Sequence, residues 1–292
     1  MMSSLKLKQA WLAIRPKTLT LALAPLLVAT ALAWSETAHL QWALIVAIAI
    51  SALCLQIGTN LYNDAVDFER GTDTANRIGF ARAGAEGWFS ANQLKKSALF
   101  FFIFFWLPAS YLIWVGGWLT VLAGVLSIMA GYGYTGGSRP IAYTPLGELT
   151  VFVFFGVIAT VGFYYLQTLH FSVSAFCLGS ALGFFASAVL LVNNYRDVDT
   201  DKQANRVTLA IYLGRPRSRW LYAGLLLVPF LSPFLLPTLT VLVWLSLPWA
   251  VFLIRRIFIE PIGANLNDLL SSTAKLQSVY GLLMSAGLIF SG

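Results

Sequence analysis

Long apolar runs, separated by short polar segments, make up most of this chain. Each run is roughly 17 to 25 residues long, the length of helix that crosses a hydrocarbon layer of about 30 Å. We place the runs near residues 18–34, 41–60, 97–114, 117–135, 148–168, 172–192, 219–236, 238–254 and 275–291. The pattern predicts an all-α, polytopic membrane protein of about nine transmembrane helices.

Composition supports this prediction, and the distribution of charge indicates how the protein is oriented in the membrane. The chain is 58% hydrophobic and 11% charged, whereas a typical soluble domain is about 25% charged. Lys and Arg residues precede the first run or follow the second, fourth, sixth and eighth, and the other loops are short, with Glu36 as their one formal charge. The positive-inside rule then places the N-terminus in the cytoplasm and, after nine spans, the C-terminus outside.

The net charge of +7 is therefore interpreted as a signal of topology. It gives no reason to expect a nucleic-acid partner. Membrane lipid is the expected surrounding, and a multi-pass protein of the cell (inner) membrane is the expected location.

Two polar stretches, residues 60–67 and 193–201, each close an apolar run. Ionisable groups at the end of a membrane helix are costly, so their presence indicates function. Residues three and four apart share a helix face, and each stretch therefore forms a stripe. The stripes consist of Asn60, Asn63, Asp64 and Asp67, and of Asn193, Asp197 and Asp201.

The two polar regions also resemble each other. Residues 63–67 match 193–197, and residues 72–78 match 200–207, so the segments near 60–78 and 193–207 form a candidate pseudo-repeat within one domain, 1–292. The repeats follow spans two and six, so their helices point the same way. We expect the stripes to face each other across a central cavity that opens to the cytoplasm.

Carboxylates, amides and arginines in this arrangement suit a metal bound with a diphosphate. Mg²⁺ prefers oxygen ligands and is usually held by one or two carboxylates together with the phosphate oxygens of a substrate. Guanidinium groups match phosphate geometry. The candidate phosphate donors are Arg77, Arg82, Arg139, Arg196 and Arg206.

At these residues the sequence resembles the UbiA superfamily of intramembrane aromatic prenyltransferases. The segments Asn63-Asp64-x-x-Asp67 and Asp197-x-x-x-Asp201 match its two aspartate-rich motifs. Segments 15–19, 71–79, 193–197 and 208–214 look most like the MenA branch, which acts on 1,4-dihydroxy-2-naphthoate. The resemblance covers nearly the whole chain.

The resemblance implies Mg²⁺-dependent ionisation of a polyprenyl diphosphate and capture of the allylic cation by 1,4-dihydroxy-2-naphthoate, with loss of its carboxylate as CO₂. It makes the four motif aspartates the metal and diphosphate ligands, with three asparagines in support. These residues are Asp64, Asp67, Asp197 and Asp201, and Asn60, Asn63 and Asn193. Asp73 is a further candidate, as a ligand or as a base near the acceptor.

Two departures from the family pattern affect other candidates. Phe80 stands where the branch usually has proline, in the loop with Arg77 and Arg82. Ser138 occupies the lysine position of a Tyr-x-x-x-Lys motif that begins at Tyr134, with Arg139 one residue later. The candidates for the acceptor's carboxylate are therefore Arg15, Lys17 and Arg139.

Two alternatives remain at this stage. A related prenyltransferase could use another aromatic acid, such as 4-hydroxybenzoate or homogentisate. A secondary transporter could use membrane-embedded acids for ion coupling, although it would then carry acids or helix breaks near mid-bilayer in both halves.

Overall fold

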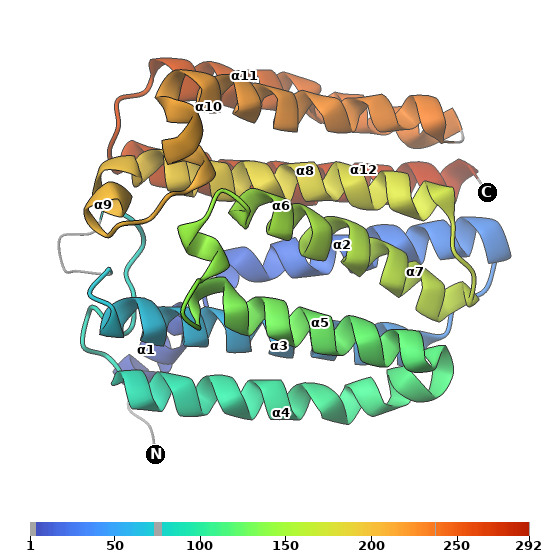
Figure 1. Ribbon diagram of the computed structural model, residues 1–292. Coiled ribbons are helices and arrows are strands. Elements are labelled where there is room, and N and C mark those ends of the chain that lie inside the picture. The colour runs from blue at the N-terminus through green and yellow to red at the C-terminus, as the bar shows by residue number, and fades with distance from the viewer. Residues whose placement is uncertain (1–3, 73–77, 237, 292) are drawn as a thin grey trace.

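The computed structural model describes residues 4–72, 78–236 and 238–291, and the regular secondary structure in these ranges is helical (Figure 1). Elements η1, η3 and η4 are 3₁₀ helices and η2 is a π-helical turn. The elements are α1 (Ser4–Ala13), α2 (Pro16–Thr37), α3 (Trp42–Glu69), α4 (Ala91–Gly116), α5 (Trp118–Thr135), η1 (Ile141–Tyr143), α6 (Gly147–Phe152), η2 (Val153–Ile158), α7 (Ala159–Thr168), α8 (Val173–Arg196), α9 (Val198–Gln203), α10 (Leu209–Leu227), η3 (Val228–Leu235), η4 (Thr238–Ser246), α11 (Leu247–Ile259) and α12 (Asn265–Ser291).

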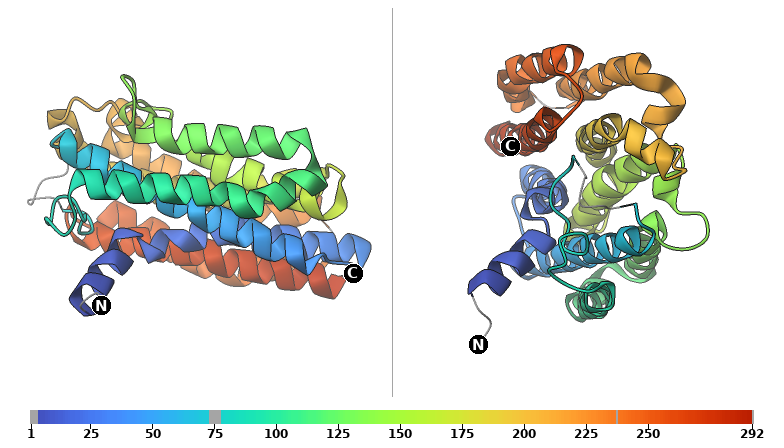
Figure 2. Two further views of the ribbon diagram at one scale, coloured as in Figure 1. Left: turned by 90° about the horizontal axis from the view of Figure 1, so that it is seen from below. Right: turned by 90° about the vertical axis from the view of Figure 1, so that its left-hand side faces the viewer.

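The long helices run side by side along one common direction, as Figures 1 and 2 show. α8 packs against α2, α10, α12 and the α6–η2–α7 segment, so most of its side chains are buried. The main hydrophobic core joins α2, α8, α10, α11 and α12. Helices α3, α4 and α5 pack on the other side of the bundle.

Eight stretches of the described helices are long and apolar enough to cross a membrane. They are Thr18–Thr37, Trp42–Glu69, Ala91–Gly116, Trp118–Thr135, Gly147–Thr168, Val173–Arg196, Leu209–Leu235 and Thr240–Ile259. Each contains or overlaps one predicted run, so the all-helical membrane fold is confirmed. α12 holds the ninth predicted run and lies parallel to the others, but it is not among these eight stretches, and its crossing stays a prediction.

The two aspartate motifs reach the same end of the bundle. α3 and α8 both finish on the left of Figure 1, where α9 also lies, and we call this end the motif end. α3 is one continuous helix through the first motif. The second motif is different, because α8 stops at Arg196 and α9 starts at Val198. The second stripe therefore bends at Asp197 instead of following one straight helix face.

Glycines bring η2 and α8 into direct backbone contact. A Cβ atom on Gly156 would lie 2.4 Å from the carbonyl oxygen of Gly179, and one on Gly183 would lie 2.7 Å from that of Phe152. Small residues allow membrane helices to approach this closely. The contact holds the α6–η2–α7 segment firmly against α8.

Candidate functional site

A cavity of about 1050 Å³ lies between α2, α3, α4, α5, the α6–η2–α7 segment and α8. Toward the opposite end its lining is largely apolar and includes Leu112, Leu119, Leu166 and Phe171. The main polar residues at the motif end are Arg15, Gln56, Asn60, Asn63, Asp67, Arg82, Tyr134, Asn193, Asn194 and Arg206. The cavity thus suits a long apolar molecule with one charged end.

The first motif presents one carboxylate to the cavity and turns the other away. Asp67 lines the cavity and is 5% exposed. Asp64, which is 1% exposed, accepts a hydrogen bond at Oδ2 from the backbone N–H of Ala83 at 2.8 Å. Its Oδ1 atom is buried and has no hydrogen-bond partner. The predicted stripe is therefore formed by α3, but Asp64 faces the loop around Ala83.

The asparagines of the first motif are held by neighbouring polar groups. Nδ2 of Asn60 donates to the carbonyl oxygen of Ile14 at 3.0 Å and to Oγ1 of Thr18 at 3.1 Å. Asn63 Oδ1 accepts a hydrogen bond from Oγ1 of Thr135 at 2.7 Å. These contacts join α3 to the start of α2 and to the end of α5.

Arg196 holds the second motif together. Its Nε and Nη2 atoms donate to the two carboxylate oxygens of Asp197, at 2.7 and 2.6 Å. The same guanidinium reaches Oδ1 of Asn193 at 2.9 Å and Oδ1 of Asn267 on α12 at 2.5 Å. Arg196 is 2% exposed, so this bidentate pair is enclosed by protein. The structure places Arg196 against the second motif and α12, outside the cavity lining.

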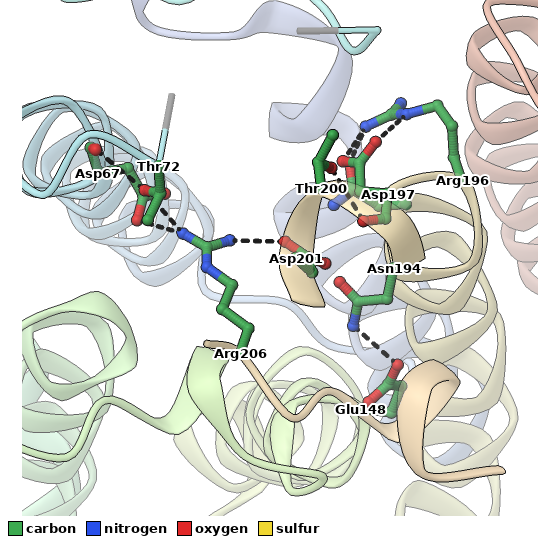
Figure 3. A network of polar contacts seen from close by, with 10 residues as sticks. Asp67, Thr72, Glu148, Asn194, Arg196, Asp197, Thr200, Asp201 and Arg206 are labelled. Carbon is green, nitrogen blue, oxygen red and sulfur yellow. Dashed lines mark hydrogen bonds and ion pairs between the residues drawn. The ribbon is translucent and has the colours of Figure 1, made fainter. Parts of the chain in front are cut away.

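Arg206 links the two motifs (Figure 3). Its Nη2 atom lies 2.7 Å from Oδ1 of Asp67, and its Nη1 atom lies 3.4 Å from Oδ1 of Asp201. The ring centroid of Tyr143 is 4.7 Å from its guanidinium carbon. Burial lowers the pKa of Arg206, but the carboxylates of Asp67 and Asp201 outweigh burial and raise it above its usual value. Arg206 is therefore a permanent cation at the cavity wall.

Arg15 is a second cation at the motif end. It precedes α2 with a left-handed φ of 56° and lines the cavity. Its Nε and Nη2 atoms are buried and have no hydrogen-bond partner. Burial lowers the pKa of Arg15, while the nearby carboxylates of Asp64 and Asp67 act in the opposite direction. Buried guanidinium nitrogens without partners indicate a place for an anionic group.

The remaining predicted residues are distributed more widely. Tyr134 and Arg82 line the cavity, whereas Arg139 is exposed and does not. Asp73 and Arg77 fall outside the described residues, and so does the side chain of Lys17. The structure thus brings Tyr134 and Arg82 together with Arg15 at the polar end.

Three residues at this site were missed by the sequence analysis. Tyr143 stacks on Arg206, and Asn194 lines the cavity while donating to Oε1 of Glu148 at 2.9 Å. Glu148 had a usable signal, because an acid inside an apolar run is costly. It stands at the first position of the predicted run 148–168, and the sequence analysis did not consider it.

The chemistry of the donor set fits Mg²⁺ bound with a phosphate ligand. Asp64, Asp67, Asp197 and Asp201 supply carboxylate oxygens, the type Mg²⁺ prefers. Oδ1 of Asp64 is buried with no partner, as a ligand oxygen would be without its metal. Among the described residues, no three His, Cys, Asp or Glu side chains lie close enough to hold one metal by themselves. Phosphate oxygens and water would have to complete the coordination.

Comparison with known proteins agrees with this description. The sequence pattern of the UbiA prenyltransferase family matches residues 22–262. A 1,4-dihydroxy-2-naphthoate octaprenyltransferase from Bacillus subtilis is 31% identical over 292 residues, which cover 96% of this chain and 92% of that protein. A protein of the same name from Escherichia coli is 38% identical over 229 residues, covering 75% of this chain and 73% of that one.

The fold has a solved counterpart as well. A UbiA homologue from Archaeoglobus fulgidus, determined bound to DMAPP and Mg²⁺, superposes with a TM-score of 0.68 at 15% sequence identity. The superposition covers 95% of this chain and 99% of the homologue. The family pattern, the relatives and the fold extend over the same helices that carry both aspartate motifs, and the chain therefore belongs to the UbiA prenyltransferase family.

Proposed function

We propose that the protein transfers a polyprenyl group from polyprenyl diphosphate to 1,4-dihydroxy-2-naphthoate, with loss of CO₂, to give demethylmenaquinol in menaquinone biosynthesis. The observation that carries the donor assignment is the cavity, which is polar at the motif end and apolar along the rest of its length. The acceptor assignment is supported by the names of the relatives from Bacillus subtilis and Escherichia coli.

The diphosphate belongs at the motif end, between the two motifs. Asp64, Asp67, Asp197 and Asp201 would hold Mg²⁺ there, and the bound ion would supply positive charge that offsets the charge developing on the leaving group. Arg206 already lies between Asp67 and Asp201, so its guanidinium can donate to phosphate oxygens at the same place.

The allylic carbon lies where the cavity changes from polar to apolar. Tyr134, Phe154 and Phe155 line the cavity, and aromatic faces attract cations more strongly when water is excluded. The apolar lining also keeps water, a competing nucleophile, from the reacting carbon. The chain itself thereby favours transfer to the aromatic acceptor over hydrolysis.

Arg15 is the best partner for the acceptor's carboxylate, because its Nε and Nη2 atoms lack partners and it lines the cavity near Asp67. In the reaction the bond between the prenyl carbon and the diphosphate oxygen breaks, and the oxygen keeps the electron pair. The ring carbon that bears the carboxylate forms the new bond. The bond to CO₂ then breaks and its electrons restore the aromatic ring, so no ring proton has to be removed.

The distribution of basic residues along the sequence supports an orientation in which the motif end faces the cytoplasm. Both substrates would then enter from that side or from the bilayer. Membership of a prenyltransferase family favours this enzyme over the ion-coupled transporter that intramembrane acids also allow. The competing proposal is prenyl transfer to 4-hydroxybenzoate or homogentisate by an enzyme of the same family.

The test is to incubate the purified protein with Mg²⁺, a polyprenyl diphosphate and each aromatic acid separately, and to identify products by mass. We expect prenylation of 1,4-dihydroxy-2-naphthoate with loss of the carboxylate mass. Prenylation of 4-hydroxybenzoate alone would overturn the acceptor assignment and leave the prenyl transfer intact.

A further inference from the structure

A buried hydrogen bond lies directly behind the cavity wall, between α6 and α8. Glu148 is 4% exposed, and its Oε1 atom accepts a hydrogen bond at 2.9 Å from Nδ2 of Asn194 (Figure 3). Asn194 lines the cavity, whereas Glu148 does not. Burying a carboxylate in a membrane protein is expensive, and the reaction proposed above does not use this one.

Glu148 determines which way the amide of Asn194 points. An ionised carboxylate can only accept hydrogen bonds, so the amide nitrogen must face it and the amide oxygen must turn away. The backbone of Glu148 is itself held against α8, since Oγ of Ser187 donates to its carbonyl oxygen at 2.7 Å. The close contact at Gly156 and Gly183 fixes the two helices just beyond this point.

Asn194 differs from the other three asparagines that line the cavity. The amide oxygens of Asn60, Asn63 and Asn193 already accept hydrogen bonds, from Gln56 at 3.3 Å, from Thr135 at 2.7 Å and from Arg196 at 2.9 Å respectively. The amide nitrogen of Asn194 instead donates to Glu148, its oxygen has no hydrogen-bond partner among the described residues, and the residue lines the cavity.

We propose that Asn194 Oδ1 accepts a hydrogen bond from a ring hydroxyl of the aromatic acceptor, and that Glu148 is the positioning residue that holds the amide in this orientation. The inference rests on the proposed function. Asn194 lies in the last turn of α8, three residues before Asp197, which directly follows that helix, so a ring bound there lies beside the diphosphate site. A hydrogen bond accepted from the hydroxyl also leaves more electron density on the ring, which favours attack on the allylic carbon.

The first experiment changes the orientation without changing the shape. In Glu148→Gln, the new amide can donate to Asn194 Oδ1 and flip it away from the cavity. We expect KM for 1,4-dihydroxy-2-naphthoate to rise about tenfold, the effect of losing one hydrogen bond, with KM for the polyprenyl diphosphate unchanged. In Glu148→Gln with Asn194→Asp, the glutamine donates to the aspartate, whose other oxygen faces the cavity, and acceptor KM should return toward the wild-type value.

Ser187→Ala is the matched control. It removes another buried hydrogen bond between the same two helices and leaves the amide of Asn194 untouched. It should lower the thermal midpoint without raising acceptor KM. An equal rise of acceptor KM in Ser187→Ala and Glu148→Gln would mean that Glu148 only joins the helices, and the proposal would be wrong.

A second experiment changes the hydroxyl groups of the acceptor and measures binding. Binding of 1,4-dihydroxy-2-naphthoate is compared with binding of the two analogues that each lack one hydroxyl, by competition in the presence of polyprenyl diphosphate. The wild-type protein should bind one analogue about tenfold more weakly, and Asn194→Leu should bind that analogue and the full acceptor equally. If Asn194→Leu still binds the full acceptor about tenfold more tightly than that analogue, the proposal is wrong. Failure of the wild-type protein to prenylate any dihydroxynaphthoate would instead overturn the proposed function.

Discussion

Nη2 of Arg206 lies 2.7 Å from Oδ1 of Asp67, although 139 positions separate the two residues in the chain. Oγ1 of Thr72 accepts a hydrogen bond from the same nitrogen at 3.0 Å, and Asp201 is within ion-pair distance of Nη1. One guanidinium therefore ties both aspartate motifs to the wall of the cavity. The pairing puts the proposed donors for a diphosphate and the proposed carboxylate ligands of its metal at one place.

Asp67 is expected to be essential for turnover. Asp67→Asn keeps the size of the side chain but removes a carboxylate, and the loss of metal-assisted charge stabilisation should lower kcat on the order of a hundredfold or more. Asp199→Asn is the matched control, because Asp199 is exposed and pairs with Arg215. Product formation is measured on purified, folded variants. Near-normal turnover by Asp67→Asn would remove this residue from the site.

Arg206 is expected to act mainly through the polyprenyl diphosphate. In Arg206→Lys a single ammonium replaces a planar fork, so it cannot reach Asp67, Thr72 and a phosphate together. Loss of a charge-assisted hydrogen bond should raise KM for the diphosphate about tenfold or more. Arg215→Lys, which alters an exposed ion pair, should leave that KM unchanged. Equal values for both variants would contradict the role of Arg206.

Much of the fold could be predicted because hydropathy and charge act locally along the chain. In the lipid interior every backbone N–H and C=O group must be hydrogen-bonded within the protein, which favours helices. The long apolar runs around Trp42–Glu69 and Val173–Arg196 can therefore be recognised as membrane helices from the sequence. The bend at Asp197 was not predicted, since the periodicity of residues 193–201 fits a straight helix equally well. At the bend Nη1 of Arg196 donates to Oδ1 of Asn267 on α12, a tertiary contact that the periodicity does not indicate.

The candidate site could be predicted only in part, because some of its contacts join residues far apart in the sequence. The motif aspartates stand out because acids are rare in apolar runs. The turning of Asp64 toward Ala83 and the reach of Arg206 to Asp67 depend on tertiary packing, which no local spacing encodes. Asn194 was not part of the predicted stripe, and its hydrogen bond to Glu148 joins residues 46 positions apart, so only the folded chain shows it.

The structure distinguishes Arg15 from Arg139 as a candidate for binding the acceptor's carboxylate. Arg15 lines the cavity with two unpartnered nitrogens, and Arg139 is exposed away from it. Arg15→Gln should raise KM for 1,4-dihydroxy-2-naphthoate about tenfold or more, as expected for a hydrogen bond to a charged group, and should change KM for the diphosphate less. The same kinetics are measured for Arg139→Gln. A larger rise in acceptor KM for Arg139→Gln than for Arg15→Gln would mean that Arg139 binds the carboxylate.

Gly162 is expected to set the usable length of the apolar cavity. It lines the cavity, and a Cβ atom added there would meet no atom within 4 Å. Gly162→Phe should therefore fill the cavity and reduce activity with long polyprenyl diphosphates more than with geranyl diphosphate. Gly133→Phe is the control, because Gly133 is equally unobstructed but does not line the cavity. If Gly162→Phe leaves the relative activity with long and short prenyl diphosphates unchanged, the prenyl group of the substrate leaves the cavity before this point.

The most direct test of the proposed reaction follows the carboxylate carbon of the acceptor. Purified protein is given Mg²⁺, a polyprenyl diphosphate and 1,4-dihydroxy-2-naphthoate labelled in its carboxylate, and both CO₂ and the prenylated product are quantified. We expect one labelled CO₂ for each prenylated naphthoquinol, and neither product in a sample without the polyprenyl diphosphate. A prenylated product that retains the label, or CO₂ released without prenyl transfer, would contradict the proposed reaction.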